Sequence, residues 1–104
     1  MKLLIITSLK EYQEAVARIL EQAGVSVFSA SETSGFKTDK DDNLAENWFA
    51  RTRNHVDSVF LFSFTRSENA TRALELIQMY NEEKQTGFPI RAFILPVENA
   101  SYKP

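Results

Sequence analysis

The chain has no cysteine, only three glycines and a single histidine among its 104 residues. The absence of cysteine excludes disulfide bonds, thiolate metal sites and thiol catalysis. The three glycines form neither a G-x-G-x-x-G nor a Walker-type phosphate loop. No nucleophile, base and orienting acid occur together in a recognisable pattern. We therefore expect a protein that is not an enzyme.

Long apolar runs and a strong charge of one sign are also missing. The amino-terminal segment holds one apolar run, Leu3 to Ile6, which is far shorter than a signal-peptide core or a membrane span. We therefore expect a cytoplasmic protein. The formal net charge is -2, whereas a nucleic-acid-binding domain usually carries a basic stripe that neutralises phosphates. We therefore expect no nucleic acid among its partners.

The composition is that of a globular protein, with 43% hydrophobic and 25% charged residues. A chain of 104 residues is long enough for one core and too short for two ordinary domains. We therefore expect a single domain over residues 1–104.

The first part of the chain predicts a strand, a helix and a second strand. Lys2 to Thr7 is a short run of mostly branched residues, and Ser8 with Glu11 forms the S-x-x-E capping box that begins a helix. Gly24 ends this helix, and Val25 to Ala30 is the second predicted strand. The apolar face of the helix consists of Tyr12, Ala15, Val16, Ile19, Leu20 and Ala23.

The second part repeats this order. Val56 to Phe64 gives the strongest strand signal, and Thr65 with Glu68, or Ser67 alone, is expected to cap a second helix. The apolar face of that helix consists of Ala70, Ala73, Leu74, Ile77 and Tyr80. A last strand is predicted over Ile90 to Leu95. This order predicts an α+β protein of the ferredoxin-like βαββαβ sandwich type, a four-stranded antiparallel sheet with two helices on one face.

Both faces of the predicted sheet are apolar. Alternation in the third strand places Val59, Leu61 and Ser63 on one face and three phenylalanines, Phe60, Phe62 and Phe64, on the other. Two helices can cover only one face, and each Å² of apolar surface left in water costs about 25 cal/mol. A homo-oligomer is the simplest way to bury the second face. The alternative is that the long loop folds back over it.

This long loop, at about residues 35–54, follows the second strand. A connection of that length inside a compact domain is usually functional or disordered. It carries Trp48 and Phe49 among charged residues. Exposed aromatic side chains make good anchors for a partner protein. We therefore interpret Trp48 and Phe49 as partner-binding residues, with packing of the loop onto the domain as the alternative.

The whole layout resembles the PII-like signalling proteins, trimeric ferredoxin-like domains with a long loop after the second strand. The stretches that carry the resemblance are Ala15 to Val25 (AVARILEQAGV), the pair Gly35-Phe36 at the loop base, and Ala92 to Glu98 (AFILPVE). The resemblance implies a trimeric regulatory protein that senses a small ligand. It also implies contact through the long loop with a partner such as a membrane transporter.

In that family an adenine nucleotide lies between subunits. The resemblance carries this ligand-binding role to Gly35 and Lys37 at the loop base, to Gly87 before the last strand, and to Arg91. The sequence also departs from the family, because Phe88-Pro89-Ile90 replaces a glycine-rich run and the tail has Lys103 but no arginine. The ligand is therefore left open, with an adenine nucleotide as one candidate.

Two other functions are compatible with the same fold. One is a metal-binding or metal-responsive protein of the CutA type, or of the type that accompanies cation efflux pumps, with His55 and loop carboxylates as ligands. The other is a small ferredoxin-like enzyme. Against the enzyme stands the lack of an acid or base within the predicted strands, where Thr7 and Ser63 are the polar residues.

Overall fold

The structure is a computed structural model that describes residues 1–36 and 55–102. The predicted loop residues Lys37, Trp48 and Phe49 therefore lie outside the described part of the chain. The elements are β1 (Lys2–Leu9), the short 3-10 helix η1 (Lys10–Tyr12), α1 (Gln13–Gln22), β2 (Ser29–Phe36), β3 (His55–Thr65), α3 (Ser67–Lys84) and β4 (Arg91–Pro96). None of the helices within the described ranges is long and apolar enough to cross a membrane.

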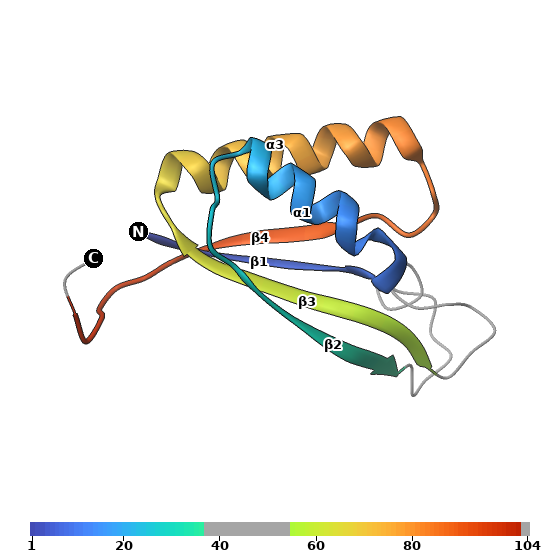
Figure 1. Cartoon of the computed structure of the whole chain (residues 1–104), viewed down its shortest axis with the longest axis horizontal. Coiled ribbons are helices and arrows are strands. Elements are labelled where there is room, and N and C mark those ends of the chain that lie inside the picture. Colours follow the sequence, from blue (N-terminus) through green and yellow to red (C-terminus); the bar gives the residue numbers. More distant parts are fainter. Residues whose placement is uncertain (37–54, 103–104) are drawn as a thin grey trace.

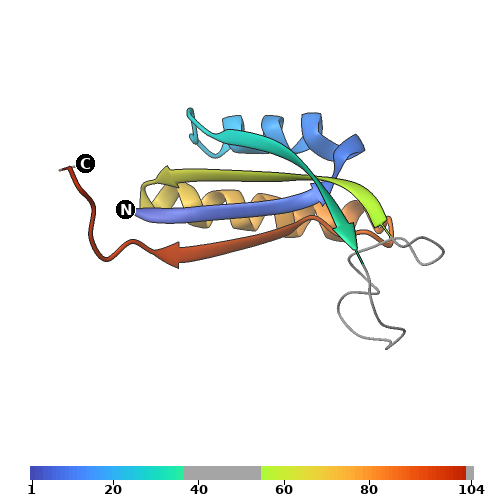
Figure 2. The ribbon, with the colours of Figure 1, turned by 90° about the horizontal axis from the view of Figure 1, so that it is seen from below.

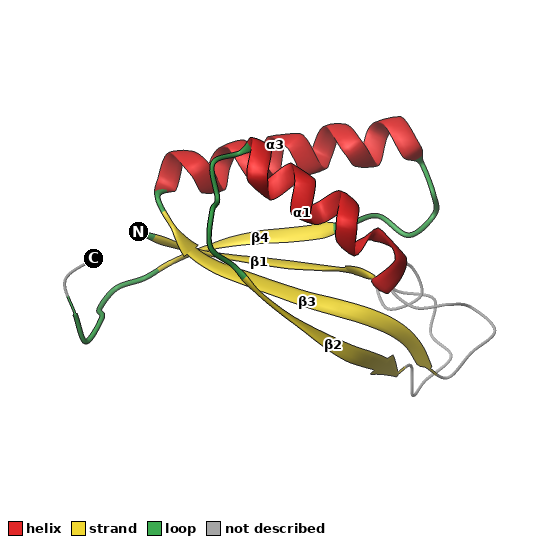
Figure 3. Cartoon of the chain, in the orientation of Figure 1, coloured by secondary structure: helices red, strands yellow, loops and turns green. Residues whose placement is uncertain are grey.

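The four strands form one antiparallel sheet in the order β2-β3-β1-β4. Both α-helices lie on the same face of this sheet (Figure 1), and the view in Figure 2 has the strands in front of them. The predicted α+β fold of the ferredoxin-like βαββαβ type is therefore confirmed (Figure 3).

The core lies between the sheet and the two helices. Directly opposed residues of neighbouring strands share a face, so the pairing of Ile6 with Leu61 and Ala92 places all three on the helix side. The residues that pack there most completely are Leu4, Ile6, Val16, Leu20, Val59, Leu61 and Ile77. Helix α3 contributes Ala70 and Ala73, two of the positions predicted for its apolar face. The predicted division of β3 into a helix face and an opposite face is also confirmed.

Both predicted capping boxes are wrong. Ser8 belongs to β1 and is buried, and its hydroxyl donates to the Leu9 carbonyl at 3.0 Å. Strand pairing continues to Leu9, opposite Ser58 of β3, so the chain reaches α1 only after the 3-10 turn. Thr65 likewise remains in β3, and α3 begins at Ser67 without a side-chain cap. Pairing along the sheet overrides the local cap signal at both sites.

The second strand is shifted along the chain from its predicted position. Instead of Val25 to Ala30, β2 spans Ser29–Phe36, although this segment is mostly small and polar. It is an edge strand, where polar side chains are common and protect against aggregation, and it pairs residue by residue with the eleven-residue β3. Val25 is instead buried in the core, and Ser63 donates a 2.6 Å hydrogen bond to the Val27 carbonyl. The segment just before β2 therefore packs against the core and bonds to β3 through a side chain.

Candidate functional site

The sheet face that points away from the helices carries a continuous apolar surface. We call this surface the open-face patch; it consists of Leu3, Ile5, Phe60, Phe62, Phe64, Phe93 and Leu95, which the strand register places side by side. The rings of Phe60 and Phe62 lie 5.9 Å apart, and those of Phe62 and Phe64 lie 6.3 Å apart in a T-shaped arrangement. Phe64 is 54% exposed and Phe93 is 46% exposed. Large exposed apolar patches usually mark interaction surfaces.

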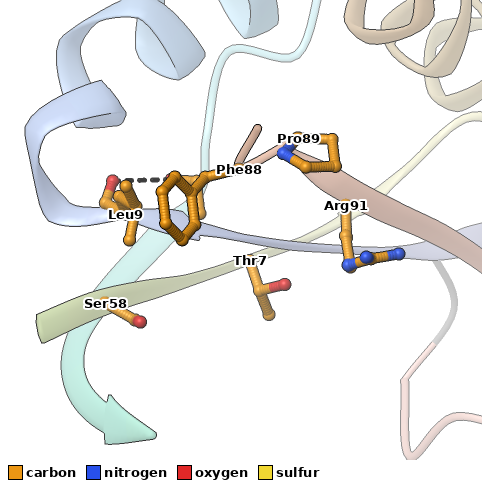
Figure 4. A pocket seen from close by; sticks show the side chains of 7 residues that line it. Thr7, Leu9, Ser58, Phe88, Pro89 and Arg91 are labelled. Atoms are coloured by element: carbon orange, nitrogen blue, oxygen red, sulfur yellow. Dashed lines mark hydrogen bonds between the residues drawn. The ribbon is translucent and has the colours of Figure 1, made fainter. Parts of the chain in front are cut away.

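At one end the open face becomes polar and forms a small hollow. Thr7 lies directly opposite Arg91 in the sheet, and Ser58 lies opposite Leu9 in the next open-face row. The side chains of Thr7, Ser58 and Arg91 project on the same side of the strands, with Phe88 beside Leu9 (Figure 4). The interior volume is about 10 Å³, which is room for about one water molecule. The hollow of a single chain therefore cannot enclose a nucleotide.

The loop from α3 to β4 forms one wall of this hollow and is held at both ends. Asn81 donates to the Ile90 carbonyl at 2.8 Å and accepts from the Ile90 N–H at 2.9 Å. Helix α3 ends at Lys84, and the next residue, Gln85, has a left-handed φ of 47° and donates its N–H to the Asn81 carbonyl. The Thr86 hydroxyl bonds to both the N–H and the carbonyl of Phe88. These bonds fix Phe88 and Pro89 in place.

Gly87 lies in the same loop with a φ of +85°, a conformation that glycine adopts without strain. It lines a second hollow of about 200 Å³ on the other side of Phe88 and Pro89. The wall of that hollow includes Tyr80 and Lys84, whose ammonium lies 5.9 Å from the Tyr80 ring centre.

The structure places Gly35 and Arg91 far apart within one chain. Gly35 is near the end of β2, opposite Val56, whereas Arg91 begins β4 on the other edge of the sheet. The two lie three strand spacings apart across the sheet and four residues apart along it, which amounts to roughly 20 Å. A small ligand cannot touch both residues of the same chain.

Sequence reasoning found Arg91 but missed the residues around it. Thr7 was recognised as polar within an apolar strand, and Phe88 was noted only as part of the run that replaces the family's glycines. Ser58 gave no signal of its own. Their proximity depends on the register of β1 against β3 and β4, which the sequence does not state. The signal that could have found Thr7 and Ser58 is that both fall on the face of the three phenylalanines.

The described residues include no group of three or more histidine, aspartate or glutamate side chains that could hold a metal ion. His55 is the first residue of β3, and the loop carboxylates that would complete the metal site of the alternative hypothesis fall outside the described ranges. That hypothesis therefore has no described site.

No protein-family model and no curated protein matches the chain, whereas several solved structures do. A DUF3240 family protein of Shewanella baltica matches with a TM-score of 0.64 and 12% identity, over 99% of this chain and 96% of that one. A PII-like signalling protein of Thermus thermophilus matches with a TM-score of 0.61 and 15% identity, over 89% and 80% of the two chains.

A third structure is that of CPII, a nitrogen regulatory PII-like protein of Thiomonas intermedia, bound to ADP, AMP and bicarbonate. It matches with a TM-score of 0.62 and 17% identity, over 89% of this chain and 84% of that one. At these identities the likeness concerns the fold. The chain has the fold of the PII-like signalling proteins, as its sequence resemblance implied.

Proposed function

We propose that this chain, which shares the fold of the PII-like signalling proteins, is a regulatory protein without enzymatic activity. It assembles into a homo-oligomer, binds a small ligand where two copies meet, and contacts a partner protein through the segment after β2. The observation that carries the proposal is the open-face patch, which ends at the hollow beside Arg91.

The open-face patch supports self-association. Phe64 and Phe93 are each about half exposed, and covering them with the same patch of another copy would bury apolar surface on both sides at once. A trimer is the arrangement that the PII-like resemblance implies, and each copy would then present its sheet to the centre of the assembly.

The separation of Gly35 from Arg91 supports a ligand site between copies. Two edges of one sheet cannot approach each other, but the β2 edge of one copy can lie beside the β4 edge of the next. Such an arrangement would bring Gly35, and Lys37 two residues later, toward the Arg91 and Gly87 of a neighbour. Adenine nucleotides and bicarbonate are the ligand candidates, because CPII was solved with both.

The partner-binding role is proposed for Trp48 and Phe49. Their aromatic side chains would anchor a partner, for which the resemblance suggests a membrane transporter. A ligand that prefers one state of the segment after β2 would change how these residues meet the partner. The chain is proposed to act in the cytoplasm.

The test is the mass of the protein in solution, measured by light scattering with and without ADP, AMP, ATP and bicarbonate. Fluorescence is followed in the same samples, because Trp48 is the only tryptophan. We expect a trimer whose fluorescence changes with at least one ligand. A monomer at all concentrations would contradict the proposed assembly, and a trimer without any response would contradict these ligands.

A further inference from the structure

We propose that the second hollow, between the end of α3 and the loop to β4, binds a small aromatic carboxylate. We call it the loop hollow; it is lined by Tyr80, Asn81 and Lys84 of α3 and by the loop residues 85–89. The ligand class is a single six-membered ring with a short acid arm, as in phenylacetate. The inference goes beyond the proposed function, because the loop hollow shares no residue with the open-face patch.

The first argument is size. The loop hollow has a volume of about 200 Å³. A cavity of about 150 Å³ is enough for one benzene molecule, whereas drug-sized ligands occupy pockets of roughly 300 to 1,000 Å³. Gly87 leaves its own position open, because no atom beyond its neighbours in the chain lies within 4 Å of where a Cβ would stand. The loop hollow therefore fits a single ring and is too small for a nucleotide.

The second argument is that the wall is already in shape. The loop leaves the orange end of α3 in Figure 1 and returns to the sheet at β4. Asn81 makes hydrogen bonds of 2.8 Å and 2.9 Å to Ile90, and the Thr86 hydroxyl bonds to Phe88. A ligand that enters this hollow does not have to order the loop, which is a cost that usually weakens the binding of small molecules.

The third argument is the chemistry of the lining, which combines an apolar wall with one cation. Tyr80, Phe88 and Pro89 offer apolar surface, and aromatic rings attract one another beyond the area that they bury. Lys84 is the one charged residue among the described residues of the lining. Its ammonium lies 5.9 Å from the Tyr80 ring centre and makes no ion pair with a described residue. A ring beside Tyr80 with a carboxylate at Lys84 uses both features.

The end of α3 determines where the carboxylate can lie. The helix ends at Lys84, and the carbonyl end of a helix carries a partial negative charge that repels an anion. The carboxylate must therefore lie at the Lys84 ammonium and not at the helix end. Binding then depends on a single exposed side chain, which can be changed without disturbing the core.

The test uses the three glycines of the chain as reporters. In the full chain made with isotopically labelled glycine, each gives one amide signal by NMR. Gly87→Asn identifies the Gly87 signal by its loss, since asparagine tolerates the left-handed conformation. Phenylacetate should shift the Gly87 signal in a saturable way, with a dissociation constant of about 1 mM or lower. The signal of Gly24, which lies beside Asn69 near the start of α3, should not shift.

Two simpler compounds separate the ring from the charge. Acetate has the carboxylate without the ring, and benzyl alcohol has the ring without the carboxylate. Each should bind at least about fivefold more weakly than phenylacetate. Equal binding of acetate would reduce the site to a contact between charges, and equal binding of benzyl alcohol would remove the role of Lys84. Either result would overturn the inference, as would the lack of a saturable Gly87 shift with phenylacetate.

Three variants test the assignment to Lys84. Lys84→Met keeps an apolar stem without the charge and should weaken phenylacetate binding about fivefold or more. Lys84→Arg keeps the charge and should bind like the original protein. The control is Lys10→Met, which removes an ammonium that lies 3.1 Å from Glu32 and does not line the loop hollow. Equal affinity of Lys84→Met and Lys10→Met would overturn the inference.

The signal of Gly35 keeps this inference apart from the proposed function. Gly35 lies near the end of β2 and belongs to the site proposed between copies. A phenylacetate shift at Gly35 without one at Gly87 would overturn the inference. A trimer in which ADP or bicarbonate shifts Gly35, and phenylacetate shifts nothing, would overturn the inference and support the proposed function. A monomer with the saturable Gly87 shift would support the loop hollow and contradict the assembly.

Discussion

Replacing Phe93 by serine should dissociate the proposed oligomer without unfolding the chain. Phe93 lies in β4 on the open face, opposite Ile5 of β1, and it is 46% exposed. The exposed part of its ring is what another copy would cover. A serine at this position keeps the strand and its pairing, and it removes the apolar surface.

The size of the effect follows from the exposed area. If the residue presents about 200 Å² in total, the exposed 46% is about 90 Å². At about 25 cal/mol per Å², covering it contributes about 2.3 kcal/mol per copy. Three copies contribute about 7 kcal/mol to a trimer, or about five powers of ten in its association constant. The concentration at which the trimer half dissociates should then rise about 300-fold, because that concentration varies with the square root of the constant.

The assay is sedimentation velocity over a dilution series, with circular dichroism to confirm that the variant is folded. Met79→Ser is the matched control, since Met79 is 59% exposed but lies on α3. It should leave the mass unchanged. The reasoning is refuted if Phe93→Ser has the mass of the original protein at every concentration, or if Met79→Ser dissociates equally.

Two further predictions concern the loop that forms the hollow. Asn81→Ala removes both hydrogen bonds to Ile90 and should lower the free energy of unfolding by about 2 kcal/mol, measured by urea denaturation. Asn69→Ala removes one exposed 3.3 Å bond and should lower the free energy of unfolding clearly less. Equal losses in the two variants would contradict this role of Asn81. Gln85→Gly should raise the melting temperature, because glycine adopts the left-handed conformation at φ 47° at a free energy about 1 kcal/mol lower than glutamine does. A lower melting temperature would show that the glutamine is not strained.

Periodicity was enough to predict the fold. The alternation in β3 separated Val59 and Leu61 from the three phenylalanines, and the strand predicted over Val56 to Phe64 lies within β3 (His55–Thr65). A period of two fixes which residues share a face without any knowledge of the partner strand. The buried face of α3 was predictable from the helical period of 3.6 residues.

Element boundaries were less predictable, because pairing partners determine them. The box of Ser8 with Glu11 gives a local cap signal, yet Ser8 is held in β1 by the strand beside it. The segment Ser29–Phe36 has a composition typical of a loop and forms a strand because β3 offers it a full ladder. In both cases the deciding contact lies far away in the sequence.

The candidate site was likewise predictable only in part. Arg91 could be found from a resemblance, but its neighbours Thr7 and Ser58 come from two other strands and become neighbours only through the register. Sequence reasoning grouped Gly35 with Arg91, and the strand order β2-β3-β1-β4 puts them on opposite edges. Strand order is a property of the whole sheet, so no local pattern could have revealed this separation.

That separation has a consequence for how a ligand could act. A ligand that touches only one chain keeps its affinity when the copies separate. A ligand that also requires Gly35 must join two chains, so its affinity must rise with the fraction of assembled protein. Titrations at several protein concentrations therefore distinguish the two modes. A dissociation constant that changes little on dilution assigns the ligand to a single chain. One that rises steeply as the proposed oligomer dissociates assigns the ligand to the boundary between copies.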